Sequence, residues 1–544
     1  MSSFDAILER FYPVWFRYHP ETAVDVGVGG HAERLRPFDD DDIGALTVLL
    51  EKLLDSLDTV DIAGLDADRR IDLELVRGAA LLELKELVEQ DWRRRDPTAF
   101  LPVHAIYQLT VREVADRPAA LRARLGAIPA HLRGARGQLG RDPSRIPPLW
   151  LEAAVTEAAS GAGYFRGLRH HPDCQRHRLD HELEEAARAL EDFARYLERE
   201  LAPRATGDFA CGREAFELRL RHRHFLDLDA DRLHNMGQRL MARTAVELRR
   251  VTRELRGDED IDAMTAALHR RHPPAEGLLD AYREGMQAAR DFVAARELVS
   301  LPEREELRVV ETPIFLRHQI PFAAYMEPQP RDPRQRGYYY VTPARDAAAL
   351  GEHNVVGLRH TCVHEAWPGH HLQFVTANAS PTASSLPRLL NPSATLYEGW
   401  ALYCEQLMQE EGFLDAPESR FVLLKDRLWR ALRVVLDVEL HTRGLGVGEA
   451  AERMVAELGF TREQAMADLT WYTLSPTVPM GYATGWALLT ETRNRLRGGD
   501  PAFQLRDFHD RVLASGSVAL PLVLRRQFGT PLWESVRRAV FGED

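Results

Sequence analysis

Apolar side chains recur every three or four residues through most of this chain of 544 residues. In the segment "IDLELVRGAALLELKELVEQDW" they stand at Leu73, Val76, Ala80, Leu84 and Leu87. This spacing matches the turn of an α-helix that buries one face. The same pattern fills residues 181–205, 230–257, 275–298 and 420–444. The sequence therefore predicts a mainly α fold.

One segment, residues 307–343, interrupts the helical pattern. It reads "LRVVETPIFLRHQIPFAAYMEPQPRDPRQRGYYYVTP", with β-branched and aromatic residues separated by prolines. These residue types predict two or three short strands that end at Tyr338–Tyr340. Because a histidine-rich helix follows, we expect a small β-sheet beside that helix. The edge of the sheet could hold an extended peptide by strand addition, or the strands could form a structural hairpin only.

The length of the chain allows one large domain or two helical lobes. A helical segment stops at Pro203, and we find no internal repeat, low-complexity tract or flexible linker. We interpret residues 1–544 as a single domain, with lobes 1–205 and 206–544 as its alternative division.

Composition and charge limit the partners of the chain. The net charge is -13 at pH 7, and no long block of like charge is present, so we expect no nucleic-acid partner. No run of about 18 apolar residues occurs, and the first residues lack the apolar core of a signal peptide. These features predict a cytoplasmic protein without a membrane partner. The four cysteines form no C-x-x-C pair, which argues against a thiolate zinc cluster.

The stretch "HEAWPGHHLQ", from His364 to Gln373, begins like the H-E-x-x-H helix of zinc peptidases. In that motif the second histidine would stand at position 368, which is Pro368 here. The next histidines, His370 and His371, come two and three residues later. An unbroken helix would place them about 9 or 10 Å along the axis from His364, whereas zinc lies about 2 Å from its ligands. A straight helix would therefore exclude a shared metal ion.

Pro368 and Gly369 argue against a straight helix. Proline lacks an amide hydrogen and clashes with the carbonyl four residues earlier, and glycine accepts backbone angles that other residues avoid. We therefore expect the helix that starts near residue 355 to be irregular at 367–369. Such a bulge would move His370 into the place of the second histidine. We favour His370 over His371 as the metal ligand.

A catalytic zinc site needs a third protein ligand and one open position. The segment "NPSATLYEGWALYCEQLMQ" supplies candidates, since Glu398 and Glu405 share a helix face at seven-residue spacing. We assign Glu398 as the third ligand and Glu405 as a carboxylate that orients a ligand. Asn391 is the expected N-cap of this helix. Apart from the histidine motif, a helical glutamate would be interpreted as a solvated surface charge.

Two further residues have candidate catalytic roles. Glu365 stands beside a candidate ligand, so it could act as general base and then as acid to the leaving amine. Tyr482 follows a turn rich in proline and glycine and could donate a hydrogen bond to an oxyanion. The alternative is a packed tyrosine with a surface hydroxyl. In that case His371 or Tyr340 would be the candidate donors.

Arg433, Asp437 and His441 align on one helix face at four-residue steps. We favour an ion-pair ladder, which this spacing commonly forms. The functional alternative is a network behind the metal site, or an arginine that binds a substrate carboxylate.

The H-E-A-x-P-G-H-H-L-Q signature resembles that of the bacterial domain-of-unknown-function 885 family, and the resemblance extends over nearly the whole chain. Supporting matches are "RYHPETAVDVG" (17–27), "GREAFELRLR" (212–221), "RGYYYVTP" (336–343), "YEGWALYCE" (397–405) and "FHDRVLASGSVALPLVL" (508–524). The family is similar to thimet-oligopeptidase-like and carboxypeptidase-like zinc peptidases. The resemblance implies two helical lobes around a deep active-site channel. It also implies two histidines, a glutamate and a tyrosine at the site, matching His364, His370, Glu398 and Tyr482.

We expect a hydrolase of peptide or amide bonds that uses one zinc ion, with another divalent metal as the alternative. Its partner would be a short peptide or one specific small amide. The segment "PTVPMGYATG" favours the specific amide, because Val478 and Ala483 replace a glutamine and a lysine of the family pattern. The rival hypothesis is a metal-binding helical scaffold without catalysis. The sequence leaves the oligomeric state open, including a dimer.

Overall fold

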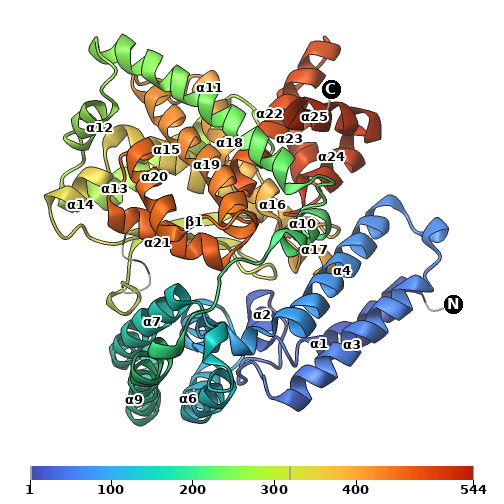
Figure 1. Cartoon of the computed structure of the whole chain (residues 1–544). Helices are drawn as coiled ribbons and strands as arrows, with labels where there is room; N and C mark the ends of the chain where they lie inside the picture. Colours follow the sequence, from blue (N-terminus) through green and yellow to red (C-terminus); the bar gives the residue numbers. More distant parts are fainter. Residues whose placement is uncertain (1–2, 318–319, 321, 543–544) are drawn as a thin grey trace. The chain divides into compact units, whose positions relative to one another are not determined.

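The helical periodicity of the sequence is realised as a mainly α fold, which confirms the predicted fold class. The computed structural model describes residues 3–317, 320 and 322–542. The chain divides into two compact units (Figure 1). Met1–Phe209 and Thr312–Pro321 form the first, and Ala210–Glu311 and Phe322–Asp544 form the second. The first division falls near residue 205, where we placed the alternative lobe boundary.

The first unit consists of helices joined by short connections. Its helices are α1 (Phe4–Trp15), α2 (Pro20–Asp25), α3 (Asp40–Asp58), α4 (Ala67–Lys85), α5 (Val103–Val111), α6 (Arg117–Leu139), α7 (Pro148–Gly167), α8 (Pro172–His177) and α9 (Asp180–Tyr196). Helix α9 packs against both α6 and α7 around buried leucine and alanine side chains.

The second unit contains every residue that we assigned to a catalytic or metal-binding role. It begins with α10 (Arg213–His222), α11 (Ala230–Arg256), α12 (Ile261–His269), α13 (Leu278–Ala295), β1 (Glu306–Glu311), β2 (Ala323–Met326), β3 (Arg336–Val341), α14 (Ala347–Glu352) and α15 (Val355–Glu365). It continues with α16 (His370–Ala379), α17 (Leu386–Leu389), α18 (Ala394–Glu410), α19 (Ser419–Thr442), α20 (Val447–Leu458), α21 (Arg462–Leu474), α22 (Gly481–Gly499), α23 (Leu505–Leu513), α24 (Leu520–Phe528) and α25 (Thr530–Phe541).

The predicted strands form a three-stranded sheet in the order β1-β3-β2. Strand β3 lies in the centre, parallel to β1 and antiparallel to β2. Side chains alternate between the two faces of a sheet, so Gly337 and Tyr339 share one face of β3. A side chain at Gly337 would come within 2.9 Å of His371 on α16. The sheet therefore lies beside the histidine-rich helix, as expected from the sequence.

Glycines bring α18 and α22 unusually close together. A Cβ atom on Gly399 would lie 2.5 Å from the Cα of Gly485, and one on Gly485 would overlap the carbonyl oxygen of Thr395. Both helices are largely buried at this crossing. The close approach matters for the site, because α18 carries Glu398 and α22 begins with Gly481 and Tyr482.

Among the described residues, no helix combines the length and apolar character needed to cross a membrane.

Candidate metal centre

The histidine-rich helix is broken where the sequence predicted. Asn354 caps the start of α15 by accepting a hydrogen bond from the backbone N–H of Gly357, and the helix ends at Glu365. Residues 366–369 are not helical, and α16 starts at His370. Within this break the backbone N–H of Gly369 donates to the carbonyl oxygen of Val363 across 3.1 Å. A hydrogen-bonded turn therefore separates α15 from α16.

Only glycine fits at position 369. A Cβ atom there would overlap the carbonyl oxygens of His364 and Val363, which belong to the preceding helix. Because the backbone at Gly369 lies so close to the preceding helix, His370 comes nearer to His364 than it would along a straight helix. As a result the ring centroids of His364 and His370 are 4.8 Å apart, with the rings nearly perpendicular.

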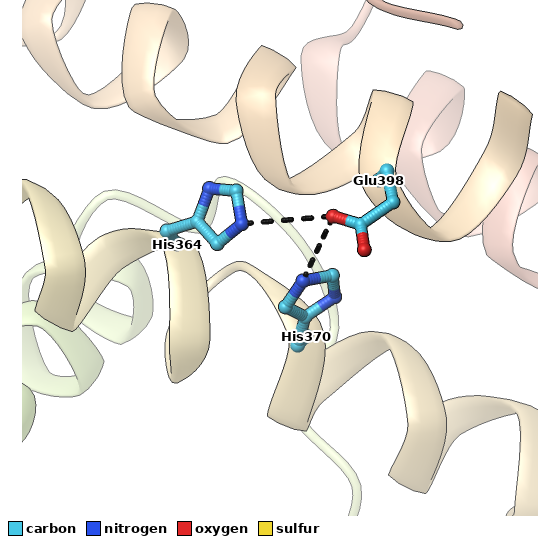
Figure 2. Close-up of side chains that lie close together, drawn as sticks. All are labelled: His364, His370 and Glu398. Carbon is cyan, nitrogen blue, oxygen red and sulfur yellow. Dashed lines mark ion pairs between the residues drawn. The ribbon is translucent and has the colours of Figure 1, made fainter. Parts of the chain in front are cut away.

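Glu398 completes a cluster of three potential metal ligands. Its Oε2 atom lies 3.3 Å from Nε2 of His370 and 3.8 Å from Nε2 of His364. One ligand atom from each residue lies within 4.8 Å of the other two. Figure 2 shows both imidazole rings directed at the same carboxylate oxygen. The structure thus brings together the three residues that we predicted as ligands.

The donor set fits a divalent metal ion. Two imidazole nitrogens and one carboxylate oxygen form the protein ligands of many catalytic zinc sites. Within the part of the chain that the structure describes, Oε2 of Glu398 is buried and makes no hydrogen bond of normal geometry. A buried anionic oxygen without a donor is costly, and a bound cation would satisfy it. His370 is also buried, with 8% of its surface exposed.

Neighbouring charges shift the pKa values of both His364 and Glu398. Burial lowers the pKa of His364, but the carboxylates of Glu398 and Glu405 outweigh this and raise that pKa to about 10. Burial raises the pKa of Glu398, but His370 and His364 outweigh it and hold that pKa well below its usual range. The site therefore favours an ionised carboxylate facing two nitrogen atoms.

Glu405 lies behind His364, on the side away from Glu398. Its Oε1 atom is 2.7 Å from Nδ1 of His364, so His364 donates a hydrogen bond from Nδ1 and leaves Nε2 for a metal ion. Nδ1 of His360 lies 3.5 Å from Oε2 of the same carboxylate. Sequence reasoning missed His360, although its position four residues before His364 places both on one face of α15.

A cavity of about 660 Å³ opens beside the cluster, and His364, Glu365 and Glu405 line it. Aromatic side chains, among them Tyr282 and Trp429, form part of its wall. Among the described residues, none forms a hydrogen bond or ion pair of normal geometry with the carboxylate of Glu365. Glu365 therefore lines the cavity with a carboxylate that is not paired with another described residue.

Tyr482 stands in the first turn of α22, within electrostatic reach of the cluster. Burial raises its pKa well above the usual value, and the nearby carboxylate of Glu398 raises it further. The guanidinium of Arg433 lies 4.6 Å from the centre of the ring. The turn before the helix is held by Asp437, whose carboxylate accepts hydrogen bonds from the backbone N–H groups of Thr477 and Met480.

Two predicted residues lie outside the cluster. His371 is fully buried, with Nε2 3.0 Å from a carboxylate oxygen of Glu305 and Nδ1 3.1 Å from the hydroxyl of Tyr325. Tyr340 lies on the opposite face of β3 from Tyr339, where its ring stacks on Tyr338. Strand parity thus places Tyr340 on the face of β3 opposite to Gly337, which adjoins His371, and its role as an alternative oxyanion donor or substrate contact stays a prediction.

The ion-pair ladder expected on α19 forms only in part, because His441 lies within ion-pair distance of Asp437 whereas Arg433 lies 3.5 Å from Asp468 on α21. Arg433 donates from Nε to the hydroxyl of Tyr472 across 2.8 Å. Asp437 is engaged by backbone N–H groups, and Nε2 of His441 lies 3.0 Å from the carbonyl oxygen of Tyr472 and 3.9 Å from Asp437. Tertiary partners thus replace the contact expected from Arg433 and add to the contact between Asp437 and His441. Of the three residues, Arg433 contacts Tyr482, and His441 packs against α10 and α21.

Comparison with known proteins places most of the chain in one family. Residues 20–527 match the model of the family described as "Bacterial protein of unknown function (DUF885)". The chain belongs to this family. The DUF885 match contains the complete candidate metal centre, from His364 to Tyr482. No curated protein is detectably similar to the chain.

Two solved structures share the fold of this DUF885 protein. One is a protein from Shewanella oneidensis, described provisionally as a lipoprotein of unknown function, with 22% sequence identity and a TM-score of 0.78. The alignment covers 97% of this chain and 99% of that one. The other is a protein from Colwellia psychrerythraea, also described provisionally as a lipoprotein, with 17% identity, a TM-score of 0.80 and 98% of both chains covered. At this identity the likeness establishes the fold.

Proposed function

We propose that the protein is a metal-dependent hydrolase of peptide or amide bonds, with one zinc ion or another divalent cation. The observation that carries this proposal is the cluster of His364, His370 and Glu398, whose ligand atoms lie within 4.8 Å of one another. The signature around these residues also resembles that of thimet-oligopeptidase-like zinc peptidases.

The proposed chemistry combines the metal with the neighbouring acid. A bound divalent ion supplies Lewis acidity, which polarises the scissile carbonyl group and makes water more acidic. The Glu365 carboxylate removes a proton from water as the water oxygen bonds to the carbonyl carbon. Glu365 then passes this proton to the amide nitrogen as the C–N bond breaks. The products are a carboxylic acid and an amine, and transfer of the remaining water proton from the acid to the amine gives a carboxylate and an ammonium ion, so atoms and charge balance without another reactant.

Other side chains would support this reaction. The Tyr482 hydroxyl, placed near Glu398, would donate a hydrogen bond to the oxygen that becomes negative in the transition state. Glu405 would hold the ring of His364 in one orientation and one tautomer through its hydrogen bond to Nδ1.

The cavity favours a small substrate. Its volume of about 660 Å³ lies in the range of pockets that hold small molecules, and aromatic residues form part of its wall. A short peptide or a single small amide would fit this space.

The rival function is a metal-binding scaffold without catalysis. A purely structural zinc site uses four protein ligands and closes the coordination sphere. Among the described residues, the cluster offers three ligands and opens onto a cavity that also contains Glu365. This arrangement favours the hydrolase.

Replacement of Glu365 by glutamine tests the proposal. Glu365→Gln keeps the size of the side chain and removes the base, so zinc content should persist while turnover of a short peptide falls about 10²–10⁴-fold. Glu352→Gln is the matched control, because Glu352 is an exposed carboxylate lining the same cavity. Equal turnover by wild type and Glu365→Gln, with zinc bound in both, would refute the assignment of the base.

A further inference from the structure

Arg430 on α19 lines the same cavity as Glu365 and His364. We propose that Arg430 binds a free carboxylate of the substrate, next to the bond that is cleaved. The preferred substrates are therefore peptides cut near a free C-terminus, or N-acyl amino acids. This inference rests on the proposed function and gives its site a substrate class.

Most hydrogen-bond donors of Arg430 are available to a ligand. An arginine side chain carries five N–H donors. In Arg430, Nη1 lies 3.3 Å from a carboxylate oxygen of Asp426, and the guanidinium stacks on the ring of Trp429 at 4.0 Å. Within the described chain, its Nε atom is buried and has no hydrogen-bond partner. Only 12% of the side chain is exposed, so water satisfies these donors poorly.

Arg433, the arginine first considered from the sequence, is already occupied. It donates to Tyr472, lies 3.5 Å from Asp468 and is surrounded by aromatic rings, including those of Trp429 and Tyr482. It is also absent from the residues that line the cavity. Arg433 therefore supports the position of Tyr482, and Arg430 is the arginine that faces the substrate space.

Among the described residues, Lys425 is the other lysine or arginine side chain in the cavity wall, but it lies on another side of α19. Its Nζ donates to the hydroxyl of Thr265 on α12 across 3.0 Å. Five residues along a helix correspond to a rotation of about 140°, so Lys425 and Arg430 face different parts of the cavity. Burial lowers the pKa of Lys425, which weakens it as a permanent anchor for an anion.

Arg430 lines the same cavity as the proposed base Glu365 and the proposed ligand His364. The volume of about 660 Å³ is that of a small-molecule pocket, so one substrate would reach from Arg430 to these groups. A carboxylate held by Arg430 would lie close to the polarised carbonyl group, which places the cleaved bond near the end of the substrate.

The chemistry of the guanidinium selects a carboxylate. Its planar donors match both oxygens of a carboxylate, and such charge-assisted pairs are stronger than neutral hydrogen bonds. A substrate amine would need an unpaired buried acid, but Asp426 is paired with Arg430 and Asp468 with Arg433 and Tyr472. Of the other acids that line the cavity, Glu352 is exposed, Glu405 contacts His364, and Glu365 is the proposed base.

Matched substrate sets test the inference. Zinc-loaded protein is offered N-acetylated peptides of two to five residues, each made with a free carboxylate and with a C-terminal amide. We expect kcat/KM to be about 10–10²-fold higher for the free acids, as one charge-assisted hydrogen bond provides. Arg430→Gln should remove this preference by lowering kcat/KM for the acids alone. Arg430→Lys keeps the positive charge but loses the planar pair of N–H donors, so it should retain part of the preference for free acids.

The outcomes separate the two proposals. Lys425→Met removes a cation from the same cavity and should leave the preference unchanged. If wild-type protein cleaves acids and amides equally, the carboxylate inference is wrong and the hydrolase stands. If Lys425→Met abolishes the preference and Arg430→Gln does not, the assignment to Arg430 is wrong. If zinc-loaded wild type cleaves neither set, the proposed function is wrong, and so is the inference that Arg430 binds a substrate carboxylate.

Discussion

Glu405 accepts a hydrogen bond from Nδ1 of His364 across 2.7 Å, and only 2% of Glu405 is exposed. Through this contact a buried carboxylate fixes which nitrogen of His364 faces Glu398. The orientation of a proposed ligand is therefore set by a residue that does not itself belong to the three-residue cluster.

Loss of this carboxylate should weaken metal binding. Glu405→Gln keeps the size of the side chain but removes the charge that supports His364, so zinc affinity should fall about 10–100-fold. Competition with a fluorescent chelator measures the change. Glu449→Gln, at an exposed glutamate on α20, is the control. Unchanged affinity in Glu405→Gln would mean that Glu405 has no orienting role.

The close packing of α18 on α22 predicts a sharp response at Gly485. A methyl group there would overlap the carbonyl oxygen of Thr395, so Gly485→Ala should push the two helices apart. We expect a large loss of thermal stability, and weaker zinc binding because Glu398 moves with α18. Gly498→Ala, on the same helix with open space around it, should change neither. A Gly485→Ala protein as stable as wild type would contradict the close approach.

The break at residues 366–369 could be predicted from sequence because its cause is local. Pro368 and Gly369 disfavour a continuous helix wherever they stand, and the spacing of His364 and His370 then indicates why the break is needed. The start of α18 was harder to predict. Asn391 and Ser393 are both good caps, and the structure uses Ser393, whose side chain accepts from the backbone N–H of Thr395.

Tyr482→Phe separates packing from catalysis. If the hydroxyl stabilises an oxyanion, its removal should lower kcat about 10²–10³-fold with little change in KM. The ring and its contact with Arg433 remain, so the melting temperature should barely move. Steady-state kinetics and a thermal melt measure both quantities. Full activity in Tyr482→Phe would assign the residue to packing alone.

His509 should make stability depend on pH. It is fully buried, with Nδ1 2.6 Å from the carbonyl oxygen of Leu298 and Nε2 2.8 Å from the hydroxyl of Tyr403. Burial lowers the pKa of His509 to about 4. The pKa of His509 is lower in the folded than in the unfolded chain. The neutral side chain therefore contributes to the free energy of unfolding, and this contribution is complete above about pH 6.5. It is lost as the pH falls toward 4.

When the pH is lowered from 7.5 to 5, His509 should reduce the free energy of unfolding by about 2 kcal/mol. Urea denaturation at both pH values measures the loss, which should be smaller in His509→Gln, where the side chain cannot take up a proton. The same loss in the two proteins would show that His509 does not titrate on unfolding.

The parts of the site that could not be predicted depend on tertiary contacts. The face of β3 that meets α16 is decided by strand parity, and the run of three tyrosines at 338–340 fits either face. Helix spacing likewise placed Arg433 on a face of α19 but gave no information about its partners. Only the packing of α19 shows that Arg433 is saturated by Tyr472 and its neighbours while Arg430 retains open donors.

The most direct test of the central claim is anomalous scattering at the zinc absorption edge, from crystals grown with zinc. We expect one strong peak about 2 Å from Nε2 of His364, Nε2 of His370 and a carboxylate oxygen of Glu398. No peak at this position in zinc-loaded crystals, or a peak bonded to His371 instead of His370, would contradict the account.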